Sequence, residues 1–218
     1  MEKPTIKREK IDTLLDTKYL KVFDLNYEKG HYMVATRRPF ERFVPPMSEE
    51  EFKSMVPDAV SCVVIVEMPG KEPQLLLSYE FRYPTGRFLL GVPAGLIDPE
   101  DLEAENPLIE TAKREIQEET GIGVQEGRDD VFVINRLSFS TPGLTDESNG
   151  LVCVILRPDN LDGLDQTGAV GQECFDGFEF VNQAKAKELL KAGVDDKGHF
   201  YSMYTWAALM YFVSDMWK

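Results

Sequence analysis

The sequence has few of the residues that build redox and zinc sites. Its 218 residues include three cysteines and two histidines. Cys62, Cys153 and Cys174 form no CxxC pair, and the first two lie in apolar, strand-like runs, so we expect buried, reduced thiols. His31 and His199 are far apart, with no cysteine or carboxylate at metal-ligand spacing, which argues against a zinc site.

Positive charge and long apolar runs are also scarce. The chain has 24 basic and 38 acidic residues, a net charge of −14. This balance argues against nucleic acid or an anionic membrane as a partner, and an anionic substrate would need a metal cation. No run approaches the roughly 20 apolar residues that span a bilayer, and residues 1–15 contain no apolar signal core. We therefore expect a cytoplasmic protein.

The familiar nucleophile and nucleotide motifs are missing as well. The chain contains no GxSxG elbow, no Walker sequence and no GxGxxG fingerprint.

Hydrophobic residues make up 43% of the chain, which is enough for a real core. We expect an N-terminal part, residues 1–56, with an antiparallel β-hairpin of strands 18–26 and 31–38, and a main domain, residues 57–218. The alternation of strands and helices in the main domain predicts the α/β class, with a mixed sheet between helices.

Most of the chain after the hairpin can be divided into strands and helices by pattern. Residues 42–55 are an insertion with a short helix and no motif that we can interpret, whereas the long, acidic, Gly-rich segment 158–176 is typical of a mobile lid. The other elements expected from apolar and β-branched runs are strands 59–67, 74–79, 88–92, 131–139, 151–156 and 177–181, and helices 183–191 and 201–217.

A central helix of about 14 residues is expected between Asn106 and Gly121. Asn is a good N-cap, Pro107 suits the first helical position, and a glycine follows the last periodic residue. The packing side carries apolar residues one turn apart, which are Leu108, Ala112 and Ile116.

Another side of this helix concentrates negative charge. Glu115 lies one turn from both Glu118 and Glu119. Each like-charge pair at this spacing costs roughly 0.2 to 0.5 kcal/mol in an isolated helix, and a bound cation would reverse the sign. Carboxylates suit Mg²⁺ or Mn²⁺, which commonly bridge to phosphates. A solvated acidic face is the alternative.

The surrounding residues favour the cation. The sequence REIQEETGI at 114–122, preceded by PAGLID at 93–98, resembles the Nudix box of pyrophosphohydrolases that cleave a nucleoside diphosphate linked to another moiety. Residues 80–82 (EFR) and 140–143 (STPG) are most similar to the ADP-ribose pyrophosphatase branch. The resemblance covers residues 59–218, and more faintly the hairpin. It implies a Nudix-type α/β/α sandwich with the N-terminal hairpin appended.

The resemblance implies Mg²⁺-dependent hydrolysis, with Mn²⁺ as a possible substitute, of ADP-ribose to AMP and ribose 5-phosphate. The metal ligands would be the carbonyl of Ala94 and the carboxylates of Glu115, Glu118 and Glu119, and Arg114 and Glu118 would serve in catalysis. Other nucleoside diphosphate sugars or dinucleotides remain alternatives, because the box reads the diphosphate and not the attached group. A non-catalytic nucleotide sensor is the alternative outside the enzymes.

Four further residues are expected to contact substrate. In the branch that this chain resembles, Tyr32 corresponds to an aromatic that stacks on adenine and Arg37 to an arginine that meets phosphate, both from the hairpin of a second subunit. A homodimer follows from this. Arg82 is suited to phosphate, with a structural salt bridge as its alternative role. Pro142 would help to select ADP-ribose, or would only form a turn; Tyr32 and Arg37 could likewise be surface residues.

Two features of the box differ from the family pattern. Ten residues separate Gly95 from Asn106, where the family has five, and Asn106 stands where the family has a glutamate. That glutamate braces the box arginine, here Arg114. We expect Asn106 to be a helix cap and Glu105 or Glu110 to take over the bracing, since Glu110 lies four residues before Arg114.

The general base is expected outside the box, because metal-bound glutamates are poor proton acceptors. Glu173 lies in the acidic loop just before the last strand, where the ADP-ribose branch is similar in placing a catalytic glutamate. Asp165 and Asp176 are the alternatives, and Glu173 could also be a solvated loop carboxylate.

Overall fold

The computed structural model describes residues 4–168 and 173–218. Contacts divide the chain into two compact units: the first comprises Met1–Pro57 and Leu137–Asn149, and the second comprises Asp58–Arg136 and Gly150–Lys218. The assignment of residues 1–56 and 57–218 to separate domains stays a prediction, and each unit is described by itself.

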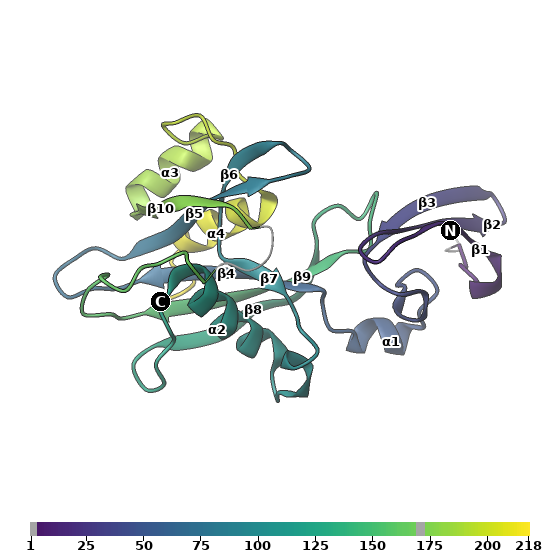
Figure 1. The fold of residues 1–218 in the computed structure, drawn as a ribbon, viewed down its shortest axis with the longest axis horizontal. Coiled ribbons are helices and arrows are strands. Elements are labelled where there is room, and N and C mark those ends of the chain that lie inside the picture. The colour runs from purple at the N-terminus through teal and green to yellow at the C-terminus, as the bar shows by residue number, and fades with distance from the viewer. Residues whose placement is uncertain (1–3, 169–172) are drawn as a thin grey trace. The chain divides into compact units, whose positions relative to one another are not determined.

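The first unit contains a three-stranded antiparallel sheet in the order β1 (Ile11–Asp16), β2 (Lys21–Tyr27) and β3 (Gly30–Thr36) (Figure 1). The predicted hairpin is β2–β3. Alternate side chains of these strands pack on Phe43, whose ring centroid lies 4.7 Å from that of Phe23. The sequence analysis missed β1, because its side chains are largely exposed and show no apolar alternation.

The rest of the first unit is short helical structure and loop. Two 3₁₀ turns, Arg8–Lys10 and Phe40–Arg42, precede helix α1 (Glu49–Ser54). In α1 the Ser48 side chain accepts from Glu51 N and the Glu51 side chain accepts from Ser48 N, a capping box that explains why so short a helix forms inside the predicted insertion.

The second unit is built on a mixed sheet in the order β10-β5-β4-β9-β8, with β6 paired to β5 and β7 paired to β4. Glu67 N, directly after β4, donates to Leu156 O at the end of β9 (2.8 Å), so these two strands run in the same direction. Strand β5 is antiparallel to β4, β6 and β10. The strand bounds are β4 Ala59–Val66, β5 Gln74–Arg82, β6 Arg87–Gly91, β7 Ala94–Leu96, β8 Asp130–Phe139, β9 Ser148–Leu156 and β10 Phe175–Val181.

Helices cover both faces of this sheet (Figure 1). Helix α2 (Pro107–Thr120) contacts β4 and β7, whereas α4 (Met203–Val213) contacts β4 and β6 and packs against α3 (Gln183–Ala192). Ile65 of β4 and Leu209 of α4 belong to one hydrophobic core cluster, and both side chains are fully buried. The predicted α/β/α sandwich with a mixed sheet is confirmed.

The element boundaries show where pattern reading was less accurate. Helix α4 is shorter than the predicted 201–217. The Ser202 side chain caps its start by accepting from Thr205 N, and the helix ends at Val213, two residues before Asp215, whose φ of 60° is left-handed. Cys62 and Cys153 are buried and free as predicted, whereas Cys174 is exposed. Among the described residues, none of the helices is long and apolar enough to cross a membrane.

Candidate active site

Helix α2 (Pro107–Thr120) has the bounds that its sequence predicts. Asn106 Oδ1 accepts from Ile109 N at 3.4 Å, and Gly121 ends the helix with φ of 72°, a left-handed conformation that glycine adopts without strain. The apolar side is buried against the sheet. Glu115 and Glu119 are buried on the same side as Leu108, Ala112 and Ile116, and only Glu118 lies away from it, so the expectation that all three glutamates lie on another side is wrong.

The backbone of strand β7 contacts two of these carboxylates directly. Ala94 N donates to Glu119 Oε1 at 3.0 Å. A Cβ on Gly95 would lie 1.8 Å from Glu115 Oε1, so only glycine allows this approach. Ala94 and Gly95 therefore bring backbone, and not side chains, to the helix.

Two of the three glutamates are withdrawn from solvent. Glu115 is 6% exposed and Glu119 is 4% exposed. Burial is the main reason that the pKa of Glu115 is raised to about 7 and that of Glu119 well above its usual value. The negative charge of Glu173 raises the pKa of both further. Such carboxylates are costly to ionise without a counter-charge.

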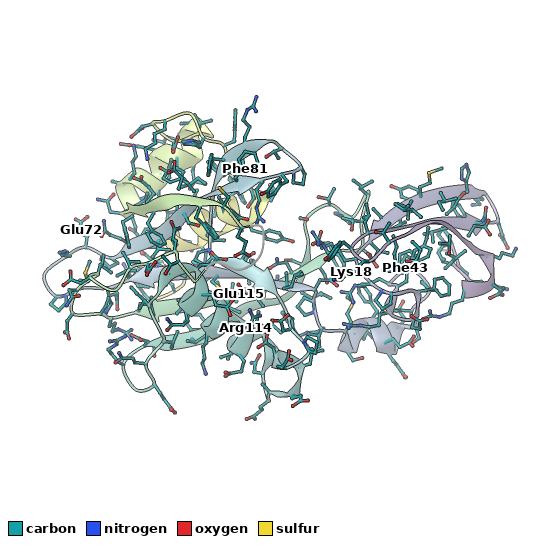
Figure 2. All side chains as sticks on the ribbon, in the orientation of Figure 1. Lys18, Phe43, Glu72, Phe81, Arg114 and Glu115 are labelled. Atoms are coloured by element: carbon teal, nitrogen blue, oxygen red, sulfur yellow. The ribbon has the colours of Figure 1, made fainter. Side chains whose placement is uncertain are left out.

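Arg114 supplies part of that counter-charge (Figure 2). Its Nη1 donates to Glu115 Oε1 at 2.7 Å and to Glu118 Oε2 at 3.3 Å. On its other side, Nη2 donates to Leu96 O and to Asp101 Oδ2, both at 2.9 Å. Arg114 thus connects the carboxylates of α2 to the loop after β7.

The expected bracing of Arg114 by Glu105 or Glu110 is wrong. Glu110 pairs with Lys113 at 2.8 Å, and the carboxylate that holds Arg114 is Asp101, in the 3₁₀ turn Asp101–Glu103. The sequence analysis missed Asp101, because a loop residue in the lengthened segment between Gly95 and Asn106 has no periodicity to mark it. Its only signal was an acidic residue within the extra length of the box.

The site suits a hard divalent cation without being preformed for one. Among residues 4–168 and 173–218, no three His, Cys, Asp or Glu side chains already converge on one metal position. The donor set nevertheless fits Mg²⁺ or Mn²⁺, because it offers carboxylates whose burial opposes their charge, beside a backbone with no Cβ to fill the space. Glu115, Glu118, Glu119 and the carbonyl of Ala94 stay the predicted ligands.

The end of β5 adds a fourth carboxylate next to the box. Glu80 Oε1 pairs with Arg82 Nη1 at 2.8 Å, and burial raises the pKa of Glu80. The charge of Glu80 in turn raises the pKa of Glu119. Sequence analysis had named Glu80 only as part of a motif. The salt bridge foreseen as the alternative role of Arg82 is present, while its contact with phosphate stays a prediction.

Glu173 lies on the box side of the last strand. Phe175, at the start of β10, pairs with Glu80 of β5, and Glu173 comes two residues before it. Its charge raises the pKa of Glu80, Glu115 and Glu119, so it lies near enough to these carboxylates to act on them electrostatically. Its role as base stays a prediction. Residues 169–172 of the expected lid lie outside the described part of the chain.

Asp165, one alternative base, is held in place by hydrogen bonds to the protein backbone. Its backbone N donates to Thr120 O at the end of α2 (2.9 Å), and its Oδ1 accepts from Thr167 N at 2.6 Å. This hydrogen bond lowers the pKa of Asp165. A carboxylate with a lowered pKa is a weaker proton acceptor.

The three other predicted substrate residues lie together in the first unit. Tyr32 Oη donates to Gly143 O at 2.5 Å, and Arg37 Nε donates to Glu147 Oε1 at 3.0 Å. Tyr32 and Pro142 line a cavity of about 330 Å³, which Phe52 and Phe139 also line. Residues more than a hundred positions apart in sequence therefore meet within one unit, although their contact with substrate stays a prediction.

Comparisons with known proteins give the same family as the box. A NUDIX domain matches residues 55–204. Putative nudix hydrolase 2 of Caenorhabditis elegans is 39% identical over 97 residues, which are 44% of this chain and 39% of the worm protein. The chain therefore spans less than half of that relative.

Two further comparisons concern ADP compounds. The ADP compounds hydrolase NudE of Escherichia coli is 29% identical over 165 residues, which are 75% of this chain and 73% of that protein. A crystal structure of an ADP compounds hydrolase matches 100% of this chain and 95% of its own, with a TM-score of 0.56 and 21% identity, which shows a shared fold. The similarity to NudE supports the predicted ADP-ribose pyrophosphatase-like branch. Since the domain match covers more than half of the 218 residues, the chain belongs to the NUDIX domain family.

Proposed function

We propose that this protein hydrolyses the diphosphate of ADP-ribose to AMP and ribose 5-phosphate with the help of Mg²⁺, for which Mn²⁺ can substitute. The observation that carries the proposal is the set of α2 glutamates, two of them buried, held against the side-chain-free backbone at Gly95. Burying carboxylates so closely is unfavourable unless a cation joins them. A diphosphate is the anionic substrate that such a cation would bind.

The choice of ADP-ribose within the diphosphates has separate support. NudE, the relative aligned over three quarters of this chain, is named as a hydrolase of ADP compounds. The cavity lined by Tyr32 and Pro142 has aromatic walls, which suit a flat base. Other ADP compounds share the base and the diphosphate. The support is therefore stronger for hydrolysis of the diphosphate than for the identity of the second product.

The reaction requires one water molecule. Its oxygen forms a bond to one phosphorus, and the bond from that phosphorus to the bridging oxygen breaks. Bound to Glu115, Glu118, Glu119 and the carbonyl of Ala94, a divalent cation would offset the diphosphate charge and lower the pKa of a bound water. Arg82, half-exposed beside Glu80, is suited to exchange that carboxylate for a phosphate oxygen.

Glu173 would accept the proton that the attacking water loses. It is exposed, its charge raises the pKa of Glu115, and it lies outside the set proposed to hold the cation. A carboxylate free of the metal keeps its basicity, which is the property that a general base needs.

A homodimer would complete the substrate site in this proposal. The sheet of the first unit exposes several apolar side chains that a monomer would leave in water: Leu14, Leu15, Tyr19, Leu20, Tyr32 and Met33. A second copy of the chain is the occupant that would also bring Tyr32 and Arg37 to its partner's substrate. Sedimentation of the full chain as an active monomer would contradict this part.

The deciding experiment is a substrate panel. The full chain is incubated with ADP-ribose, other ADP sugars and dinucleotides, with and without Mg²⁺, and products are identified by mass. AMP and ribose 5-phosphate, formed only with the metal, are the expected result. Binding of these compounds without turnover would instead make the protein a nucleotide sensor.

A further inference from the structure

Asp101 is a buried carboxylate with three donors on one oxygen. Its Oδ2 accepts from Asp98 N at 3.1 Å, from Thr111 Oγ1 at 2.9 Å and from Arg114 Nη2 at 2.9 Å. Asp101 is 8% exposed, and Thr111 is fully buried. One oxygen therefore ties the loop after β7 to two successive turns of α2.

Arg114 divides its guanidinium between two groups of acceptors. The Nη2 side is held by Asp101 and Leu96 O, outside the proposed cation ligands. The Nη1 side reaches Glu115 and Glu118, which are proposed ligands. The strength with which Asp101 holds one side determines how much of the positive charge is left to pair with the other.

We infer that Asp101 is a positioning residue, which anchors Arg114 and limits its ion pairing with Glu115 and Glu118, so that both carboxylates stay available to a divalent cation. The inference rests on the proposed function and deepens it. It assigns to a loop aspartate a task that the usual box sequence gives to the residue at the position of Asn106.

The other residues that could hold Arg114 are less suited to this task. Asn106 is uncharged and is used as the cap of α2, and Glu110 is paired with Lys113. Asp98 approaches Arg114 only to 3.6 Å, and its side chain is 55% exposed. Solvent screens an exposed pair strongly, whereas Asp101 acts from within the protein.

Removing the charge of Asp101 should therefore make Arg114 a competitor of the cation. The guanidinium would keep Glu115 and Glu118 as its close charged partners, with Asp98 more distant and exposed, and a cation would have to displace it. Loss of a residue that orients metal ligands typically weakens metal binding by about 10-fold or more. Thr111 touches the same oxygen without carrying charge, so it offers a matched control.

The test measures Mn²⁺ binding to the full chain by electron paramagnetic resonance, without substrate and well below the unfolding temperature. Asp101→Asn should weaken binding about tenfold. Thr111→Val should lower thermal stability and leave Mn²⁺ affinity unchanged. Should Asp101→Asn not fold, Asp101→Ser, which is smaller and keeps an acceptor, takes its place.

A double-mutant cycle decides whether Asp101 acts through Arg114. Asp101→Asn should have no further effect on Mn²⁺ affinity once Arg114→Gln is present. Wild-type affinity in Asp101→Asn, or an equal loss in both backgrounds, would overturn the inference and leave the proposed hydrolysis standing. A wild-type chain that neither binds Mn²⁺ nor turns over any diphosphate would refute the proposed function, and the inference with it.

Discussion

Gly95 lies so close to Glu115 that a Cβ on the glycine would stand 1.8 Å from Glu115 Oε1. The buried carboxylate occupies the space that any other residue at position 95 would need. A contact between backbone and carboxylate therefore shapes the site, and it lies across the interface of β7 and α2.

Gly95→Ala should displace Glu115 and abolish most of the activity. Overpacking of this kind costs about 1 to 3 kcal/mol of stability. Steady-state kinetics and denaturant unfolding measure the two effects. Gly91→Ala is the matched control, because its Cβ would meet only Ser78 O at an ordinary 3.8 Å. Normal turnover in Gly95→Ala would show that Glu115 can move without loss of function.

Glu119→Gln should abolish activity and leave the fold intact. The amide keeps an acceptor for Ala94 N and removes a charge that burial opposes. At pH 8 without metal, the variant should be as stable as the wild type or more stable in thermal unfolding. Near-normal turnover at limiting Mg²⁺ would exclude Glu119 as a ligand.

Stability without metal should fall as the pH rises from 5 to 8. The pKa of Glu115 is raised to about 7 in the folded protein, so the folded state binds more protons than the unfolded state between its ordinary pKa and that value. The stabilisation that Glu115 contributes is fully present below the ordinary pKa of a glutamate and is lost as the pH rises past 7. Glu119 acts in the same direction.

Glu115→Gln should flatten this pH dependence, and saturating Mg²⁺ should reverse it in the wild type. The aspartates with lowered pKa values, such as Asp101 and Asp195, are ionised in both states above pH 5 and leave the window unchanged. Urea unfolding at each pH gives the measurement. A wild-type stability that rises over the same window would contradict the burial of an ionisable Glu115.

Asn106→Ala should destabilise the protein by roughly 0.5 to 2 kcal/mol, the usual effect of losing an N-cap. Turnover per folded molecule should barely change, because Asp101 and not Asn106 holds Arg114. Thermal unfolding and kcat are compared in the same preparation. A large fall in kcat at wild-type stability would give Asn106 a direct catalytic role.

Glu173→Gln should lower kcat by roughly 10² to 10⁴, as expected for the loss of a general base. Substrate affinity and Mn²⁺ binding should change little, since Glu173 is proposed to bind neither. Asp176→Asn, a change of another exposed carboxylate three residues away, is the control. An unaltered rate at saturating substrate would move the role to Asp176 or Asp165, or back into the box.

The sequence by itself determined helix α2 and the clustering of three carboxylates near its C-terminal end. Three features set the ends of this helix: capping by Asn106, the proline at the first helical position and the glycine after the last. Each depends on interactions within one turn of chain, so the local sequence is enough to predict it. The spacing of the three glutamates follows from helical geometry alone. The buried strands likewise follow from their apolar runs.

Only the tertiary structure decided which groups meet these glutamates. Asp101 reaches Arg114 because the loop after β7 folds back on α2, and no periodicity marks a residue in such a loop. The proximity of Glu80 to Glu173 depends on the pairing of β5 with β10, nearly a hundred residues apart. Contacts of this kind depend on the path of the whole chain, whereas caps and helical spacing depend on neighbours a few residues away.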